Sequence, residues 1–286
     1  MQQVEIFDRN AVKKRRTRAV RQFRPGADFI AAIAAADIAE RLAPINRSFD
    51  VAIDLGGHND AVCDVLKSSG KTKHVFSGDL FVANTHRRAT DFVFDDALPP
   101  LADGCCNLIL SALTLHAVND LPGSLVQLRR ALRPDGLLLA TLVGGDTLHE
   151  LRDVLMRAEL EMMGGAAIRV APFTDTRDAG ALLQRAGFAL PVADKDSIIV
   201  RYDNMFGLLN DLRAMGSTAA LADQGSPLSR QTLFKAAEIY ASDYADEDGR
   251  IRATFDLITL SGWAAHESQQ KPLKPGSAQK RLSDVL

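Results

Sequence analysis

Short apolar runs alternate with amphipathic stretches along most of the chain. The runs lack the polar–apolar alternation of a strand with one face in water, and helical segments separate them. A parallel sheet that is covered by helices on both faces has this pattern. The runs that predict strands are 51–55, 74–78, 92–94, 107–113 and 137–143, followed by 197–202 and 254–263.

The stretches between these runs have the spacing of helices with one apolar face. The spacing predicts a helix over 121–132, which Arg133-Pro134-Asp135-Gly136 ends with a sharp turn. Thr147 and Glu150 have the spacing of a capping box, so another helix is expected to open there. The remaining predicted helices are 28–42, 61–67, 174–186, 204–215 and 229–244.

These elements predict an α/β fold. We expect a doubly wound, mostly parallel, seven-stranded sheet of the Rossmann-like type, with an N-terminal helical arm and a C-terminal helical insertion. The expected segments are a basic arm and helix at 1–45, a main domain at 46–270 with the insertion at about 204–250, and a flexible basic tail at 271–286.

Composition excludes extended disorder over most of the chain, because 47% of residues are apolar, 24% are charged and the net charge is −2. Basic residues are concentrated in 13–24. They form either a solvated helical face or a surface for phosphates, anionic lipid or an acidic partner. Aromatic residues are sparse in this segment, so nucleic-acid binding is not expected.

The expected location is cytoplasmic. No apolar run is long enough to span a membrane, and residues 1–8 lack the apolar core of a signal peptide. The three cysteines, Cys63, Cys105 and Cys106, do not have the number or spacing of a disulfide framework, which favours reduced thiols. No group of histidine, cysteine and carboxylate residues has metal-ligand spacing, so we predict no metal site.

Acidic residues and glycines follow several of the predicted strands, and the carboxyl ends of parallel strands meet at one edge of a sheet. Asp54-Leu55-Gly56-Gly57 ends the first run, and Asp79 ends the second. Such a turn lets backbone amides approach a ligand, and a carboxylate after the second strand can accept from ribose hydroxyls. Asp95 or Asp96 after the third run can accept from an adenine amino group. Each acid taken alone is more often a cap or turn residue.

Several motifs are similar to those of class I methyltransferases, which depend on S-adenosylmethionine. The family pattern D-x-G-x-G-x-G begins at Asp54, and three later stretches fit the group: 95–101, 131–137 and 182–188. A narrower likeness covers nearly the whole chain. The segments 6–9, 115–122, 144–152, 261–263 and 266–269 resemble the methyltransferase-fold assembly factor of respiratory complex I and its bacterial relatives. The malonyl carrier protein methyltransferases of biotin synthesis are more remotely similar.

The resemblance implies an S-adenosylmethionine site and a modified protein or small acceptor. The cofactor residues that it implies, together with their neighbours at the strand ends, are Asp54, Gly56, Gly57, Asp79, Leu80, Asp95, Asp96 and Leu113. His116 follows the fourth strand, where it either orients substrate, acts as a base or is a buried structural residue. Asp146, Thr147 and Arg152 are candidates for substrate binding, with the capping box as the alternative explanation of Thr147.

The glycine loop departs from the family pattern. His58 and Asp60 stand where the family has glycines, so their side chains are expected to crowd the methionine moiety, and the access of glycine to positive φ is lost. A one-residue deletion would make Gly57 the second glycine and leave Asn59, which tolerates left-handed geometry, near the third. A fold that has lost its cofactor is the alternative.

Several functions remain open on the sequence. The first is an S-adenosylmethionine-dependent methyltransferase acting on a protein or small molecule. The resemblance to the assembly-factor group implies a second, hydroxylation of an arginine on a complex I subunit. The third is a non-catalytic assembly protein. A nucleic-acid modifying enzyme rests only on the basic segment 13–24. A dehydrogenase ranks low, because the loop at Gly56 also departs from the dinucleotide-binding pattern.

Overall fold

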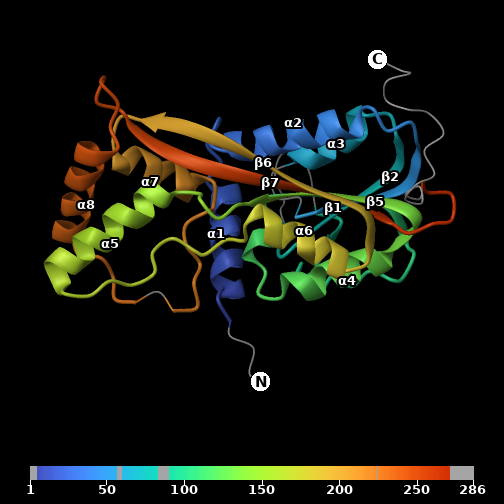
Figure 1. Cartoon of the computed structure of the whole chain (residues 1–286), viewed down its shortest axis with the longest axis horizontal. Helices are drawn as coiled ribbons and strands as arrows, with labels where there is room; N and C mark the ends of the chain where they lie inside the picture. Colours follow the sequence, from blue (N-terminus) through green and yellow to red (C-terminus); the bar gives the residue numbers. More distant parts are fainter. Residues whose placement is uncertain (1–4, 57–59, 83–89, 224, 271–286) are drawn as a thin grey trace, which may run out of the picture.

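A computed structural model describes residues 5–56, 60–82, 90–223 and 225–270. Seven strands form one sheet in the order β3-β2-β1-β4-β5-β7-β6 (Figure 1). Strands β1 to β5 are parallel, and β7 runs antiparallel to both of its neighbours. The strands are β1 Phe49–Leu55, β2 Thr72–Asp79, β3 Phe92–Val93, β4 Cys106–Ala112, β5 Leu132–Val143, β6 Phe188–Tyr202 and β7 Ile251–Ala264. The predicted fold class is confirmed.

Helices cover both faces of the sheet. Helices α2 (Phe29–Leu42) and α3 (Ala61–Ser68) pack on one face, and α4 (Leu121–Ala131) and α6 (Thr176–Arg185) pack on the other (Figure 1). Neighbouring side chains of β4 therefore enter different cores: Leu108 and Leu110 face the first core, and Ile109 faces the second. Burial on both faces explains why this strand is apolar at consecutive positions.

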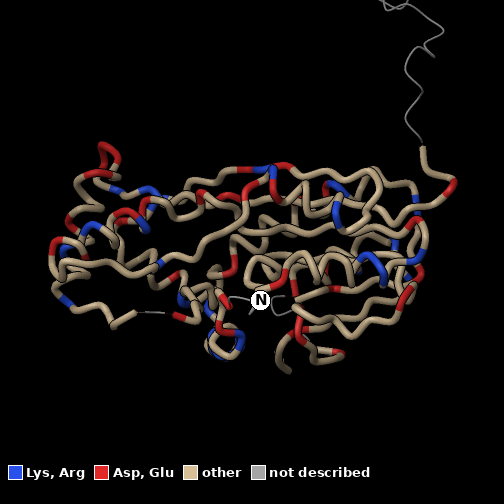
Figure 2. Tube along the Cα trace, turned by 60° about the horizontal axis from the view of Figure 1, so that its bottom comes forward, with Lys and Arg blue, Asp and Glu red and all other residues tan. Residues whose placement is uncertain are grey.

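The two last strands extend beyond the rest of the sheet. Residues 257–263 of β7 pair with β5, whereas residues 251–256 pair with β6 and not with β5. Helices α5 (His149–Met163), α7 (Met205–Ala214) and α8 (Arg230–Asp243) pack around this extension as a separate lobe, at the left of Figure 1. We call these three helices and the strand extension the helical lobe. Acidic and basic residues are interspersed along both the helical lobe and the rest of the described chain (Figure 2).

Helix α1 (Arg9–Arg21) is held against the carboxyl end of the sheet by the segment before it. The side chain of Asn119 accepts hydrogen bonds from the backbone N–H groups of Ile6 and Phe7, at 3.0 and 2.8 Å. Phe7 also pairs with Leu221 in a short antiparallel bridge. The predicted basic arm is thus a helix with a fixed position on the sheet.

Two predicted strand boundaries differ from the structure by five residues or more. Strand β5 begins at Leu132 instead of residue 137, because Leu132 pairs with Cys106 before a register irregularity. Strand β6 begins at Phe188 instead of residue 197. It is the edge strand, and its many exposed positions do not form an apolar run. Within the described ranges, no helix combines the length and apolar character needed to cross a bilayer.

Candidate functional site

The tip of β1 contains a buried carboxylate and a glycine that no other residue could replace without strain. Asp54 is buried and accepts a hydrogen bond from the Ser77 hydroxyl at 2.9 Å. Gly56 has φ of +87°, and a Cβ at this position would lie 2.0 Å from Oγ1 of Thr114. The close approach of Gly56 to the tip of β4 therefore requires glycine. Gly57, His58 and Asn59 lie outside the described residues.

Two of the predicted carboxylates converge from neighbouring strands. Asp79 and Asp96 are both buried, and their nearest oxygens lie 3.7 and 3.9 Å from Nη1 of Arg16. Asp79 also accepts a hydrogen bond from the backbone N–H of Leu80 at 2.5 Å. The side chain of Asp95 is instead 44% exposed and points toward Arg9, 2.7 Å away. Of the two acids predicted after the third strand, Asp96 is the one directed inward.

Helix α1 supplies two arginines to this cluster, and the sequence motifs do not predict them. Arg9 pairs with both Asp95 and Asp96, and Arg16 is 5% exposed beside Asp79 and Asp96. Burial lowers the pKa of Arg16, and the charge of Asp79 opposes this effect. Arg9, Val12 and Arg16 have the spacing of one helix face, and Val12 is buried. This spacing could have indicated a buried ion pair, because an arginine on the apolar face of a helix needs a buried partner of opposite charge.

The tip of β4 contributes to a cavity of about 1020 Å³. Leu113, with φ of +55°, and His116 line it, and the His116 ring meets Phe173 edge-on with centroids 5.7 Å apart. Most of the other lining residues are apolar. They come from α1, α2 and the helical lobe and from the loop segments 169–173 and 215–220. His116 thus lies on a cavity wall, and its role in orienting a substrate stays a prediction.

Arg16 separates this cavity from the strand-tip carboxylates. Arg16 lines the cavity, whereas Asp54, Asp79 and Asp96 do not. The guanidinium lies 3.7 and 3.9 Å from Asp79 and Asp96, and Arg16 is also one of the residues that line the cavity. The predicted cofactor residues and the cavity are therefore adjacent, with one buried side chain between them.

Asp60 corrects an expectation about the glycine loop. With aspartate in place of glycine, positive φ is expected to be lost at this position, but Asp60 has φ of +59°. Aspartate is one of the few side chains that visit the left-handed region, because its short polar group tolerates it. Asp60 lines the cavity and precedes α3 as its N-cap, yet its carboxylate makes no capping hydrogen bond.

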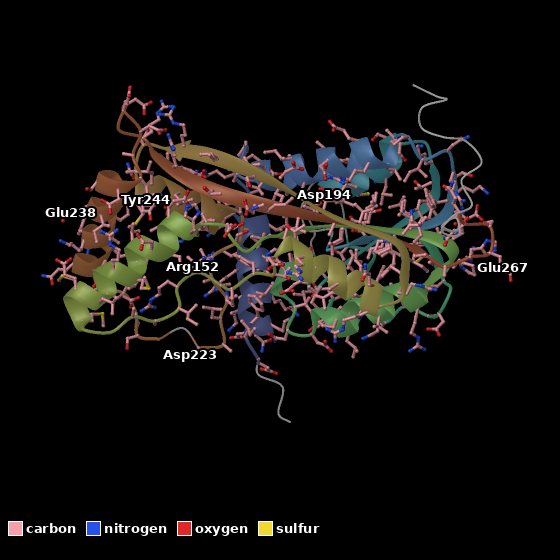
Figure 3. The ribbon with its side chains drawn as sticks, viewed as in Figure 1. Arg152, Asp194, Asp223, Glu238, Tyr244 and Glu267 are labelled. Atoms are coloured by element: carbon pink, nitrogen blue, oxygen red, sulfur yellow. The ribbon has the colours of Figure 1, made fainter. Side chains whose placement is uncertain are left out.

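The three predicted substrate residues lie in different environments. The side chain of Asp146 is 75% exposed and pairs with Lys195 at 3.4 Å. Arg152, labelled on α5 in Figure 3, donates to the carbonyl oxygens of Gly145 and Thr147 at 3.3 and 3.4 Å. Only Thr147 lines the cavity.

The predicted capping box at Thr147 is wrong. Helix α5 begins at His149, after Leu148 in a left-handed conformation. The Thr147 hydroxyl instead accepts from the backbone N–H of Asp256 at 2.9 Å, and Glu150 accepts from the backbone N–H of Thr254 at 3.1 Å. Tertiary hydrogen bonds to β7 have replaced the local cap.

The site has unsatisfied polar atoms that fit an adenosyl cofactor. Oδ2 of Asp96 and Nη1 of Arg16 are buried and make no hydrogen bond within the described ranges. Buried polar atoms normally have partners, and a ligand with amino and hydroxyl donors would supply them for the carboxylate. In the part of the chain that the structure describes, no three histidine, cysteine or carboxylate side chains are grouped as metal ligands.

Comparisons with known proteins agree with this architecture. The methyltransferase domain family matches residues 29–191. The human mitochondrial arginine-hydroxylase NDUFAF5 is 36% identical over 96% of this chain and 81% of its own length. The malonyl-[acyl-carrier protein] O-methyltransferase of Laribacter hongkongensis is 34% identical over 62% of this chain and 57% of its own.

Among solved structures, the YcgJ protein from Bacillus subtilis matches with a TM-score of 0.55 at 13% identity, covering 82% of this chain and 98% of YcgJ. This likeness concerns the fold alone. The whole-length sequence similarity is more specific, because it includes α1 and the helical lobe. The chain therefore belongs to the methyltransferase domain family and, within it, to the group that contains the mitochondrial arginine-hydroxylase NDUFAF5 proteins.

Proposed function

We propose that this protein binds S-adenosylmethionine at the tips of β1 to β4 and modifies an arginine side chain of a respiratory complex I subunit. The observation that carries the cofactor proposal is the convergence of two buried carboxylates, Asp79 and Asp96, from adjacent strands on one atom of Arg16. Carboxylates in this position suit the hydroxyl and amino donors of an adenosine group. Similarity over 96% of the chain to an arginine-hydroxylase supports the acceptor.

Each residue has a role in this proposal. Asp79 accepts from the ribose hydroxyls, Asp96 accepts from the adenine amino group, and Gly56 allows the backbone to approach the cofactor closely. When bound, S-adenosylmethionine would supply an activated methyl group for methyl transfer, whereas hydroxylation of the arginine would take its oxygen atom from an external oxidant such as dioxygen. His116, on the wall of the adjacent cavity, orients the acceptor. The apolar cavity walls exclude water from the acceptor side chain.

The cofactor site is tested by Asp79→Asn. We expect this change to weaken the binding of S-adenosylhomocysteine by roughly 1.5 to 3 kcal/mol, because it replaces a charge-assisted hydrogen bond with a neutral one. Isothermal titration calorimetry measures the dissociation constant. Asp95→Asn is the control, since Asp95 is partly exposed and directed away toward Arg9. Equal affinities for the wild type and Asp79→Asn, or no heat for the wild type, would contradict the proposed site.

The acceptor is tested by mass spectrometry of complex I subunits from wild-type cells and from cells that lack this protein. We expect one arginine to lose the mass of an oxygen atom in the deletion strain, as the arginine-hydroxylase relatives suggest. A difference of one methylene group would instead identify methyl transfer. Identical arginine masses, with complex I still failing to assemble, would favour a non-catalytic assembly protein.

A further inference from the structure

Helix α1 has two faces of different character. The inner face, which includes Val12 and Arg16, is buried and lines the cavity. The outer face borders a separate pocket on the surface of the protein, and every residue that lines this pocket is polar or charged. Five of the lining residues form what we call the basic face: Lys13, Lys14, Thr17, Arg18 and Arg21.

The positive charge of the basic face has no negative counterpart on the helix. Helix α1 contains no aspartate or glutamate. Arg9 and Arg16, which lie off this face, pair with buried or partly buried aspartates. In the described part of the chain, the four cations of the basic face are exposed and take part in no ion pair.

This concentration of charge works against the stability of the helix. Lys14 and Arg18 are one helical turn apart, and like charges at that spacing repel each other. Burial lowers the pKa of Arg15, and the charge of Arg18 lowers it further. A bound anion would relieve this repulsion, so the basic face is suited to a negatively charged partner.

The composition of the surface pocket distinguishes between kinds of anionic partner. Helices that bind anionic membranes insert large apolar side chains beside their cations, and no described residue that lines this pocket is apolar. Single-stranded nucleic acids stack on aromatic rings, but Phe23, the nearest aromatic residue along the chain, lines the cavity instead. Carboxylates need only cationic donors, which arginine and lysine supply. The pocket therefore fits aspartate and glutamate side chains best.

The length and position of the basic face suit a short segment of a protein. From Lys13 to Arg21 the helix rises about 12 Å, which roughly four residues of an extended chain can span. Arg21 lines both the surface pocket and the cavity. A segment bound along the basic face therefore reaches the edge of the cavity.

We propose that the basic face binds an acidic segment of the protein acceptor. The inference rests on the proposed function, because the partner is the protein that carries the modified arginine. Aspartate or glutamate side chains of the segment pair with Lys13, Lys14, Arg18 and Arg21, and this holds the acceptor beside the cavity. Opposite charges also speed the encounter of the two proteins. The basic face binds the acceptor and takes no part in the chemical step.

The test measures the binding of fluorescein-labelled hexaglutamate by fluorescence anisotropy at low ionic strength. Lys14→Gln combined with Arg18→Gln should weaken binding roughly 5-fold or more, because two of the four cations are lost. The affinity of the wild type should also fall as salt is added. The matched control removes two exposed arginines from α6, Arg177→Gln with Arg185→Gln, and should change the affinity by less than about 2-fold.

Two further measurements guard this test. The Lys14→Gln, Arg18→Gln variant should unfold at or above the wild-type temperature, since its substitutions are exposed and remove a repulsive pair. A short oligothymidine and phosphatidylserine vesicles should bind the wild type more weakly than hexaglutamate does. Tighter binding of either probe, lost in this variant, would overturn the inference and assign the basic face to nucleic acid or to anionic lipid.

Mass spectrometry of the acceptor arginine connects the basic face to the reaction. In cells that contain the Lys14→Gln, Arg18→Gln variant, we expect a smaller modified fraction of that arginine than in wild-type cells. Calorimetry should show an unchanged affinity for S-adenosylhomocysteine. Full modification in the variant, or equal hexaglutamate affinities for variant and wild type, would overturn the inference. An unmodified arginine in wild-type cells would instead contradict the proposed function, and anisotropy reports on the basic face independently of that result.

Discussion

Gly56→Ala is expected to lower the free energy of unfolding by roughly 3 kcal/mol or more. Two costs add at this position. Alanine at φ of +87° is strained, and its Cβ would lie 2.0 Å from Oγ1 of Thr114, so the tips of β1 and β4 must move apart. Chemical denaturation, followed by circular dichroism, measures the change.

Gly70→Ala is the matched control for this prediction. Gly70 also has positive φ, +64°, but a Cβ there has no atom within 4 Å. Only the backbone cost applies, so we expect a loss of about 1 kcal/mol. Equal losses for the two variants would show that the contact between Gly56 and Thr114 does not constrain the strand tips.

Arg169→Met is expected to destabilise the protein by about 3 kcal/mol at pH 7, because it leaves the buried Glu159 carboxylate without its partner. Nη2 of Arg169 lies 2.5 Å from Glu159, whose side chain is 2% exposed. Arg169 also donates to the carbonyl oxygen of Ser226 at 2.7 Å. The pair connects the end of α5 to the segment that precedes α8.

The effect of Arg169→Met should depend on pH. Hydrogen bonding from Arg169 lowers the pKa of Glu159 below its ordinary value. The pair therefore stabilises the folded wild type above the pKa of an unfolded glutamate, and this contribution is lost as the pH falls through the lower pKa of the folded state. Urea denaturation of wild type and variant should show a difference that shrinks below about pH 4.

Two further variants complete the test of the pair. Glu159→Leu combined with Arg169→Met should recover much of the lost stability, because no charge is left buried. Arg157→Gln removes a partly exposed arginine that pairs with Asp153 and Asp243, and we expect little change in stability. A pH-independent loss in Arg169→Met would indicate that lost packing, and not the ion pair, causes the destabilisation.

The strands at the centre of the sheet were predictable because burial on both faces leaves a continuous apolar run. Strand β4 is the clearest example, with successive residues in two different cores. Strand β6 could not be delimited in the same way. It lies at the edge of the sheet, where many of its residues are partly exposed, so it has no continuous apolar run. Its length is set by its pairing with β7.

The sequence predicts the position of a site residue when that residue follows directly from the order of the strands. It does not predict the position of a residue that depends on how distant elements pack. Asp54 and Asp79 end their strands, so the parallel sheet brings them to one edge. Arg16 lies far from them in sequence, and its burial depends on how α1 docks. Thr147 satisfies a local capping pattern, but hydrogen bonds to β7 hold it instead.

Strands β6 and β7 extend beyond the rest of the sheet, so part of the cavity wall comes from a different region of the chain than the strand-tip carboxylates. The carboxylates at the strand tips come from the first half of the sequence, whereas Leu155, Leu209 and Leu233 of the helical lobe supply distant walls of the cavity. Substitutions in that lobe can reshape the cavity that we propose for the acceptor without contacting Asp79 or Asp96. Under that proposal, acceptor choice can diverge among related chains while the proposed adenosine site is preserved.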